Sequence, residues 1–101
     1  MIRDLSNPEI IAMLGRNFRH YRLLQGMTQM ELANKTNVSS TTIHKFENGR
    51  LTNITLGNLL SLMRHVGILE NVAGLIPEQP ESPYAKIKTR VRHAASQYHK
   101  D

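Results

Sequence analysis

The stretch TQMELANKTNVSSTTIHKFENG, residues 28–49, predicts two short helices joined by a tight turn. Thr28 and Glu31 have the spacing of a capping box, in which a Thr at the N-cap and a Glu three residues later satisfy each other's backbone N–H groups. Ser39 can cap the second helix in the same way. Gly49 is the residue type that ends helices in the left-handed conformation. The stretch therefore contains a start signal for each helix and an end signal for the second.

The residues between these signals predict a turn between the two helices and a buried and an exposed face on the second helix. Asn37 falls at the turn, where we expect the left-handed conformation, which Asn tolerates better than other residues with a side chain. Val38 fills the corner, and Ile43 and Phe46, three residues apart, supply a buried face. The outer face keeps short polar and basic residues: Ser40, Thr41, His44 and Lys45. This layout is that of a helix-turn-helix, whose second helix can read DNA.

Residues on either side of this stretch predict three further helices. Asn7-Pro8-Glu9 starts the first, with Asn7 as the cap and Pro8 at the first helical position, and Gly26 ends it. Asn53 or Thr55 caps a fourth helix, and residues 68–76 add a short fifth. The apolar stripes expected to be buried are Ile11, Leu14, Phe18 and Tyr21 in the first helix and Leu56, Leu59, Leu60, Met63 and Val66 in the fourth. No strand pattern occurs in residues 1–76, so we predict an all-α, five-helix domain over residues 7–76.

The composition changes at Pro77, and residues 77–101 form a Pro-rich linker followed by a basic tail. Residues 79–101 carry five Lys/Arg against two acids, a net charge of +3 out of +5 for the whole chain. The sequence leaves the state of this tail open. It is compatible with a disordered extension, with a weak helix through Ile87 and Val91, and with a strand added to a partner. The functional interpretation is a mobile basic arm that follows phosphates.

Composition narrows the class of protein. A net charge of +5 favours polyanionic partners such as nucleic acid. The chain has no cysteine, and its five histidines lack the spacing of metal ligands, so we expect no metal and no cofactor. We found no catalytic triad order, nucleotide-binding glycine loop or carboxylate pair, and predict that it is not an enzyme. No signal peptide and no apolar run of about 18 residues occurs, so we expect no membrane and a cytoplasmic protein. The family resemblance described next implies that this cytoplasm is prokaryotic and that the protein is nucleoid-associated.

The chain resembles the Xre family of phage repressor and Cro-type regulators over residues 14–76. The positions in register with that family are Leu14-Gly15, Phe18-Arg19, Arg22, Thr28-Gln29, Leu32-Ala33, Val38-Ser39, Thr42-Ile43, Phe46-Glu47-Asn48-Gly49 and Thr55-Leu56. One departure is Asn37, where the family more often has Gly. The resemblance implies a sequence-specific regulator of double-stranded DNA, most simply a repressor that binds a two-fold operator as a homodimer.

The resemblance also implies residue roles. The base-contacting residues would be Ser40, Thr41, His44 and Lys45. The phosphate-contacting residues would be Gln29, Ser39, Thr42, Asn48, Gly49 and Arg50. Arg22 and Glu47 would form a structural ion pair between the first and third helices. Leu69, Val72, Leu75 and Ile76 exceed what a small core needs and are the expected dimer interface.

Two alternative functions stay open. The Pro-rich basic tail on a helix-turn-helix body resembles antitoxins that also bind a toxin protein. A helical adaptor that binds protein without DNA is an alternative of another class. The polar and basic outer face at Ser40, Thr41, His44 and Lys45 argues against the adaptor, for which an acidic face would be expected.

Overall fold

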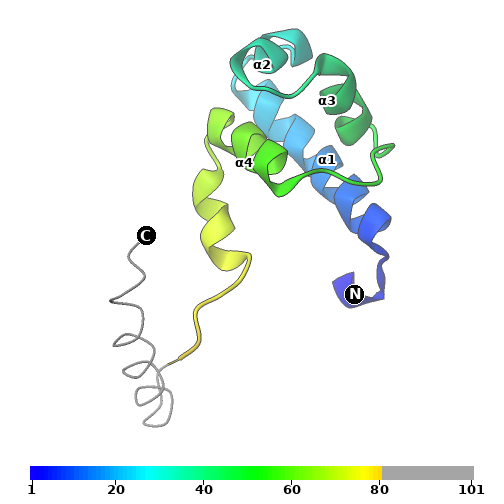
Figure 1. Ribbon diagram of the computed structural model, residues 1–101, viewed down its shortest axis with the longest axis vertical. Helices are drawn as coiled ribbons and strands as arrows, with labels where there is room; N and C mark the ends of the chain where they lie inside the picture. Colours follow the sequence, from blue (N-terminus) through cyan, green and yellow to red (C-terminus); the bar gives the residue numbers. More distant parts are fainter. Residues whose placement is uncertain (81–101) are drawn as a thin grey trace, which may run out of the picture.

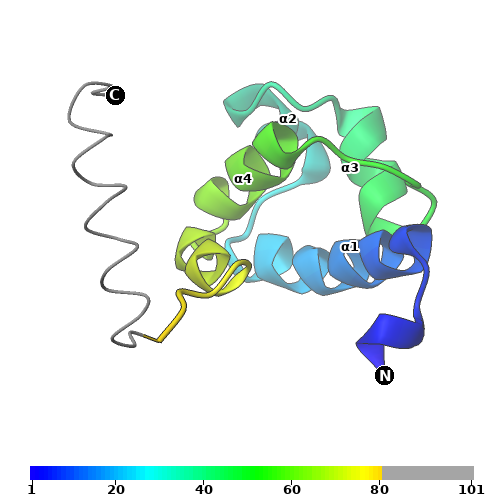
Figure 2. The same cartoon turned by 60° about the horizontal axis from the view of Figure 1, so that its bottom comes forward.

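The computed structural model describes residues 1–80, which are folded into helices with no strand among them. The elements are the 3-10 helix η1 (Ile2–Asp4), α1 (Asn7–Leu24), α2 (Gln29–Lys35), α3 (Ser40–Glu47), α4 (Leu56–His65) and the 3-10 helix η2 (Leu69–Gly74). α1 packs against α3, α3 against α2, and α4 against α2 and η2. Both views place η2 away from α3 (Figures 1 and 2). The all-α prediction is confirmed.

Each α-helix starts at a side-chain cap that the sequence supplies locally. Thr28 and Glu31 form the predicted capping box of α2, and Ser39 and Thr55 cap α3 and α4. At α1 the prediction was wrong by one residue, because Ser6 is the N-cap and forms the capping box with Glu9. Asn7 is instead the first helical residue, since Ser6 stands three residues before Glu9 and completes the reciprocal pair of bonds.

The core consists of seven buried apolar residues from α1, α2, α3, α4, the turn between α2 and α3, and the C-cap of α4. These are Phe18, Leu32, Val38, Ile43, Phe46, Leu62 and Val66. The predicted stripes need correction, because Leu62 is fully buried whereas Leu56 is 58% exposed. Leu14 and Tyr21, expected to be buried, are 37% and 42% exposed. Burial in α1 follows instead the line of Gly15, Phe18 and Arg22, which faces α3.

A glycine sets how closely α1 and α3 approach. A Cβ on Gly15 would lie 1.7 Å from the backbone carbonyl oxygen of Phe46, so no side chain fits at this position. One turn further along α1, the ring of Phe18 lies 5.7 Å from the ring of Phe46, centroid to centroid, at a tilt of 42°. The two helices are therefore in backbone contact at Gly15 and in aromatic contact at Phe18.

The corner between α2 and α3 is built differently from the prediction. Among residues 1–80 only glycines have positive φ, so Asn37 does not adopt the left-handed conformation. Thr36 is extended, at φ −125° and ψ 174°, and ends α2. Its hydroxyl donates to the Leu32 carbonyl at 2.9 Å and accepts the Val38 N–H at 3.2 Å. Because this hydroxyl bridges the end of α2 to the corner, the turn needs no left-handed residue.

The fifth helix is a short 3-10 helix, Leu69–Gly74, instead of an α-helix over residues 68–76. Its residues are partly or fully exposed, and the helix has no buried side chain. The predicted tail states, with Ile87 and Val91, lie outside the described residues. None of the helices in the described part of the chain is long and apolar enough to span a membrane.

Candidate nucleic-acid interface

Helix α3 separates a buried apolar face from an exposed polar face. Ile43 and Phe46 are fully buried, because they face α1 and α2. Thr41, His44 and Lys45 are exposed on the other side, and Ser40 is half-buried at the first helical position. The structure thus brings all four predicted base-contacting residues onto one short helix. Whether they contact bases stays a prediction.

A shallow hollow lies between the start of α2 and the outer face of α3. It is lined by Gln29 and Met30 from α2 and by Ser40, Thr41 and His44 from α3. The predicted phosphate contact, Gln29, therefore borders three of the four predicted base contacts. Met30 is 59% exposed and adds an apolar wall that the sequence interpretation did not assign.

A buried ion pair joins α1 to the end of α3. Arg22 donates from Nε to Oε2 of Glu47 at 2.6 Å and from Nη2 to Oε1 at 2.7 Å. The Arg22 Nη1 also donates to the Met27 carbonyl at 2.7 Å, and no described buried side-chain polar atom lacks a partner. The hydrogen bonds to Glu47 raise the pKa of Arg22 above its already high ordinary value, so the guanidinium stays charged.

The ion pair also orients the amide of Gln29. Its Nε2 donates to Glu47 Oε1 at 3.1 Å, which fixes the side chain at the start of α2. An amide nitrogen carries two protons, so a second donor stays available to a ligand such as a phosphate. The predicted structural pair and the predicted phosphate contact therefore form one network.

The two predicted hydroxyl contacts take part in capping α3. Ser39 Oγ accepts the Thr42 N–H at 3.1 Å and donates to Thr42 Oγ1 at 2.9 Å. Because Thr42 Oγ1 is the acceptor of that bond, its own proton can be donated outward. Thr42 is thus the better placed of the two to contact a phosphate.

The turn after α3 contains the other predicted phosphate contacts. Gly49 has φ +72°, a conformation that suits glycine, and exposed Asn48 and Arg50 flank it. The Asn48 amide lies 3.0 Å from the His44 ring nitrogen Nε2, and the Arg50 N–H donates to the Lys45 carbonyl at 2.9 Å. The end of α3 is therefore tied to the turn that follows it.

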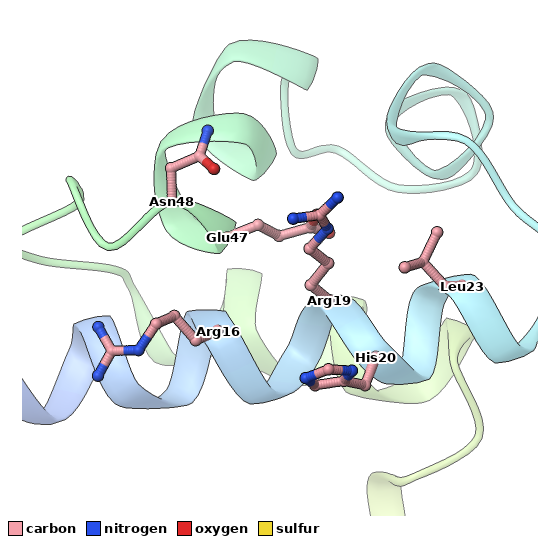
Figure 3. Close-up of a pocket in the computed structure, with 6 residues that line it drawn as sticks. All are labelled: Arg16, Arg19, His20, Leu23, Glu47 and Asn48. Atoms are coloured by element: carbon pink, nitrogen blue, oxygen red, sulfur yellow. The ribbon is translucent and has the colours of Figure 1, made fainter.

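Sequence reasoning missed a second hollow, formed by α1 and the end of α3 (Figure 3). Its lining comprises Arg16, Arg19, His20 and Leu23 from α1 with Glu47 and Asn48. The available signal was the spacing of Arg16, Arg19 and His20 at i, i+3 and i+4, which places them on one side of a helix. The sequence did not show that α3 ends opposite that side.

An apolar groove lies on a third part of the surface, between α1, α4 and η2. Its lining comprises Leu14, Asn17, Phe18, His20, Tyr21, Leu24, Phe46, Leu59, Met63, Ile68, Asn71, Val72 and Leu75. Two of the predicted interface residues, Val72 and Leu75, therefore join exposed residues of α1 such as Leu24. Leu69 and Ile76 do not line the groove, although Ile76 is 85% exposed.

Within residues 1–80, no group of three or more His, Asp or Glu side chains could hold a metal ion. In comparisons with known proteins, a family model described as a helix-turn-helix domain matches residues 13–73, from within α1 to η2. Neither the curated proteins nor the solved structures gave a match. The matched residues include the whole of α2, α3 and α4 and the hollow at the start of α2.

Proposed function

The chain belongs to the helix-turn-helix domain family, and we propose that it is a sequence-specific regulator that binds double-stranded DNA. The observation that carries the proposal is the two-sided character of α3. A helix whose inner face is fully buried and whose outer face offers hydroxyl, imidazole and ammonium groups suits the major groove. The protein would act in a prokaryotic cytoplasm, and repression is the simplest regulatory outcome.

In this mechanism the outer face of α3 reads base edges while its surroundings hold the backbone. Ser40, Thr41, His44 and Lys45 would enter the groove. Gln29, the Thr42 hydroxyl and the turn at Asn48, Gly49 and Arg50 would contact phosphates, which fix the register of α3 without reading sequence. The Glu47 network supports this role, because it holds Gln29 beside the outer face of α3.

Binding as a homodimer would double the small footprint of one α3. An eight-residue helix reaches few base pairs, so two copies on a two-fold operator add their contacts. The groove between α1, α4 and η2 supports this part of the proposal, because it combines exposed Leu24 and Leu75 at 80% and 60%. η2, which supplies Val72 to this groove, lies away from α3 in both views, so a second copy seated against η2 would leave the exposed face of α3 free (Figures 1 and 2).

Selection of bound sequences from a random duplex pool tests the proposal directly. We expect enrichment of an inverted repeat whose half-sites are about 34–36 Å apart, one helical turn of DNA. Enrichment of a single unrepeated site would support sequence-specific DNA binding but contradict the proposal of a two-fold operator. A pool that is bound without enrichment, or not bound at all, would overturn sequence-specific recognition.

A further inference from the structure

Two arginines of α1 face the end of α3 without an acidic partner among residues 1–80. Figure 3 shows Arg16 and Arg19 one turn apart on α1, with Asn48 and Glu47 at the facing end of α3. Within residues 1–80 the ion pairs join the N-terminus to Asp4 and Arg22 to Glu47, so neither exposed arginine has a carboxylate at bonding distance. Like charges three residues apart on a helix repel each other. An anion bound between them would relieve that repulsion.

The one carboxylate in this hollow is already neutralised. Glu47 accepts both Arg22 bonds and the Gln29 bond, and its side chain is only 1% exposed. The local charge is therefore that of Arg16 and Arg19. Arg16 also lies close over the turn, since its Nη1 would be 3.3 Å from a Cβ on Gly49.

The arginine hollow adjoins the hollow at the base-reading face of α3. Asn48 lines the arginine hollow and His44 lines the hollow at the base-reading face, and their side chains are 3.0 Å apart. Glu47 lines the arginine hollow and Gln29 lines the other hollow, and Gln29 donates a hydrogen bond to Glu47 at 3.1 Å. A DNA strand bordering a groove occupied by α3 would therefore pass the mouth of the arginine hollow.

We infer that Arg16 and Arg19 form a phosphate-binding site for the DNA backbone, with the Asn48 amide as a further hydrogen-bonding group. Guanidinium groups suit this ligand, because their planar donors match phosphate oxygens. This inference rests on the proposed DNA binding and adds α1 to the interface. The site is independent of base identity, so it should strengthen binding to cognate and random duplexes alike.

The salt dependence of binding tests this site. Arg16→Gln with Arg19→Gln should lower the slope of log affinity against log salt by about 0.9 for each phosphate that a subunit no longer neutralises. Gln has a helix propensity similar to Arg, so circular dichroism should show an unchanged fold. The matched control is Arg3→Gln with Arg64→Gln, which removes the same charge from exposed positions in η1 and α4 that do not line the hollow. The control should keep the wild-type slope.

The outcomes separate this site from DNA binding as a whole. A wild-type slope in the Arg16 and Arg19 variant, or an equal fall in the control, would overturn the site while leaving the proposed function standing. A wild-type protein that binds no duplex would overturn both. Arg16→Lys with Arg19→Lys should retain most of the slope, since the charge is kept. Ethylation of the contacted phosphate should hinder the wild type and cease to hinder the glutamine variant.

Discussion

Arg22 and Glu47 are 25 residues apart in sequence and joined by two hydrogen bonds of 2.6 and 2.7 Å. The pair joins the last turn of α1 to the end of α3, and Glu47 also bonds Gln29 at the start of α2. It therefore links the stability of the domain to the placement of a predicted phosphate contact. Loss of either partner should affect both properties.

Removing one member of this pair should cost much more than removing both. Glu47→Leu should lower the free energy of unfolding by about 3–5 kcal/mol, because it leaves the Arg22 guanidinium buried without its carboxylate. Arg22→Met combined with Glu47→Leu should recover most of that loss, since no buried charge is left. Urea unfolding of the two single variants and the double variant measures the coupling. Arg19→Ala is the control, and as an exposed change it should stay within about 0.5 kcal/mol of wild type.

Gly15 should be irreplaceable for steric reasons. Gly15→Ala places a methyl group 1.7 Å from the Phe46 carbonyl oxygen, so α1 and α3 must move apart. We expect a loss of about 3 kcal/mol, at the upper end of ordinary overpacking. Gly57→Ala in α4 meets nothing within 4 Å and should be neutral or stabilising by up to about 1 kcal/mol. Equal thermal stability of the two variants would contradict this account of the helix crossing.

The sequence predicted local features well because neighbouring residues determine them. The Thr28 and Glu31 capping box, the Ser39 and Thr55 caps and the buried Ile43 depend on spacings of a few residues. The N-cap of α1 is also a local feature. It was misplaced because the prediction did not use the Ser6 and Glu9 pair, although this pair was present in the sequence.

Features that depend on a second element could not be predicted in the same way. Periodicity shows that one side of a helix is apolar, but it does not show which element covers that side. Periodicity therefore could not predict that Leu14 and Tyr21 are exposed or that Leu62 is buried. The grouping of Arg16 with Asn48 likewise depends on where α3 ends over α1.

Acid should weaken the two capping boxes. The N–H of Ser6 donates to Glu9 at 2.8 Å and that of Thr28 to Glu31 at 2.9 Å, and these bonds lower the pKa of both carboxyls below the ordinary value of 4.5. A lowered folded-state pKa means that the stabilisation is fully present above the unfolded value. It is then lost as the pH falls through the folded-state pKa.

Thermal unfolding of Glu9→Gln with Glu31→Gln measures this effect. The variant keeps the hydrogen-bonding shape but no charge, so its Tm should lie below that of the wild type near neutral pH. The difference should shrink as the pH is lowered from about 7 to about 3. Glu70→Gln is the control, because it removes the same type of charge from a carboxylate that makes no hydrogen bond within residues 1–80. A Tm difference between wild type and variant that grows as the pH falls would contradict the stabilising role of the Glu9 and Glu31 carboxylates.

Base reading by α3 should be separable from folding. Thr41 and Lys45 are exposed, so Thr41→Ala and Lys45→Ala should leave the unfolding free energy nearly unchanged. Each should weaken binding to the selected duplex by about 1–3 kcal/mol and weaken binding to a scrambled duplex less. Both duplexes must be compared at one salt concentration. Equal losses on the two would reassign the residue to phosphate contact, and no loss on either would remove it from the interface.

The apolar groove should control assembly. Leu75 lines the groove and is 60% exposed, so Leu75→Asp should leave the fold intact while placing a charge in a surface that a second copy would cover. We expect a folded monomer with reduced affinity for the two-fold operator. Leu56→Asp provides a matched control, because Leu56 is 58% exposed on α4 and does not line the groove.

Light scattering with and without duplex measures this difference. The wild type and Leu56→Asp should both be dimeric, and Leu75→Asp should be monomeric with unchanged circular dichroism. A dimer that survives Leu75→Asp together with Leu24→Asp would place the interface elsewhere, because both residues line the groove and are exposed. A wild type that stays monomeric at tens of micromolar, on and off DNA, would remove the homodimer. In that case the groove would be an exposed apolar surface on a regulator that reads a single half-site.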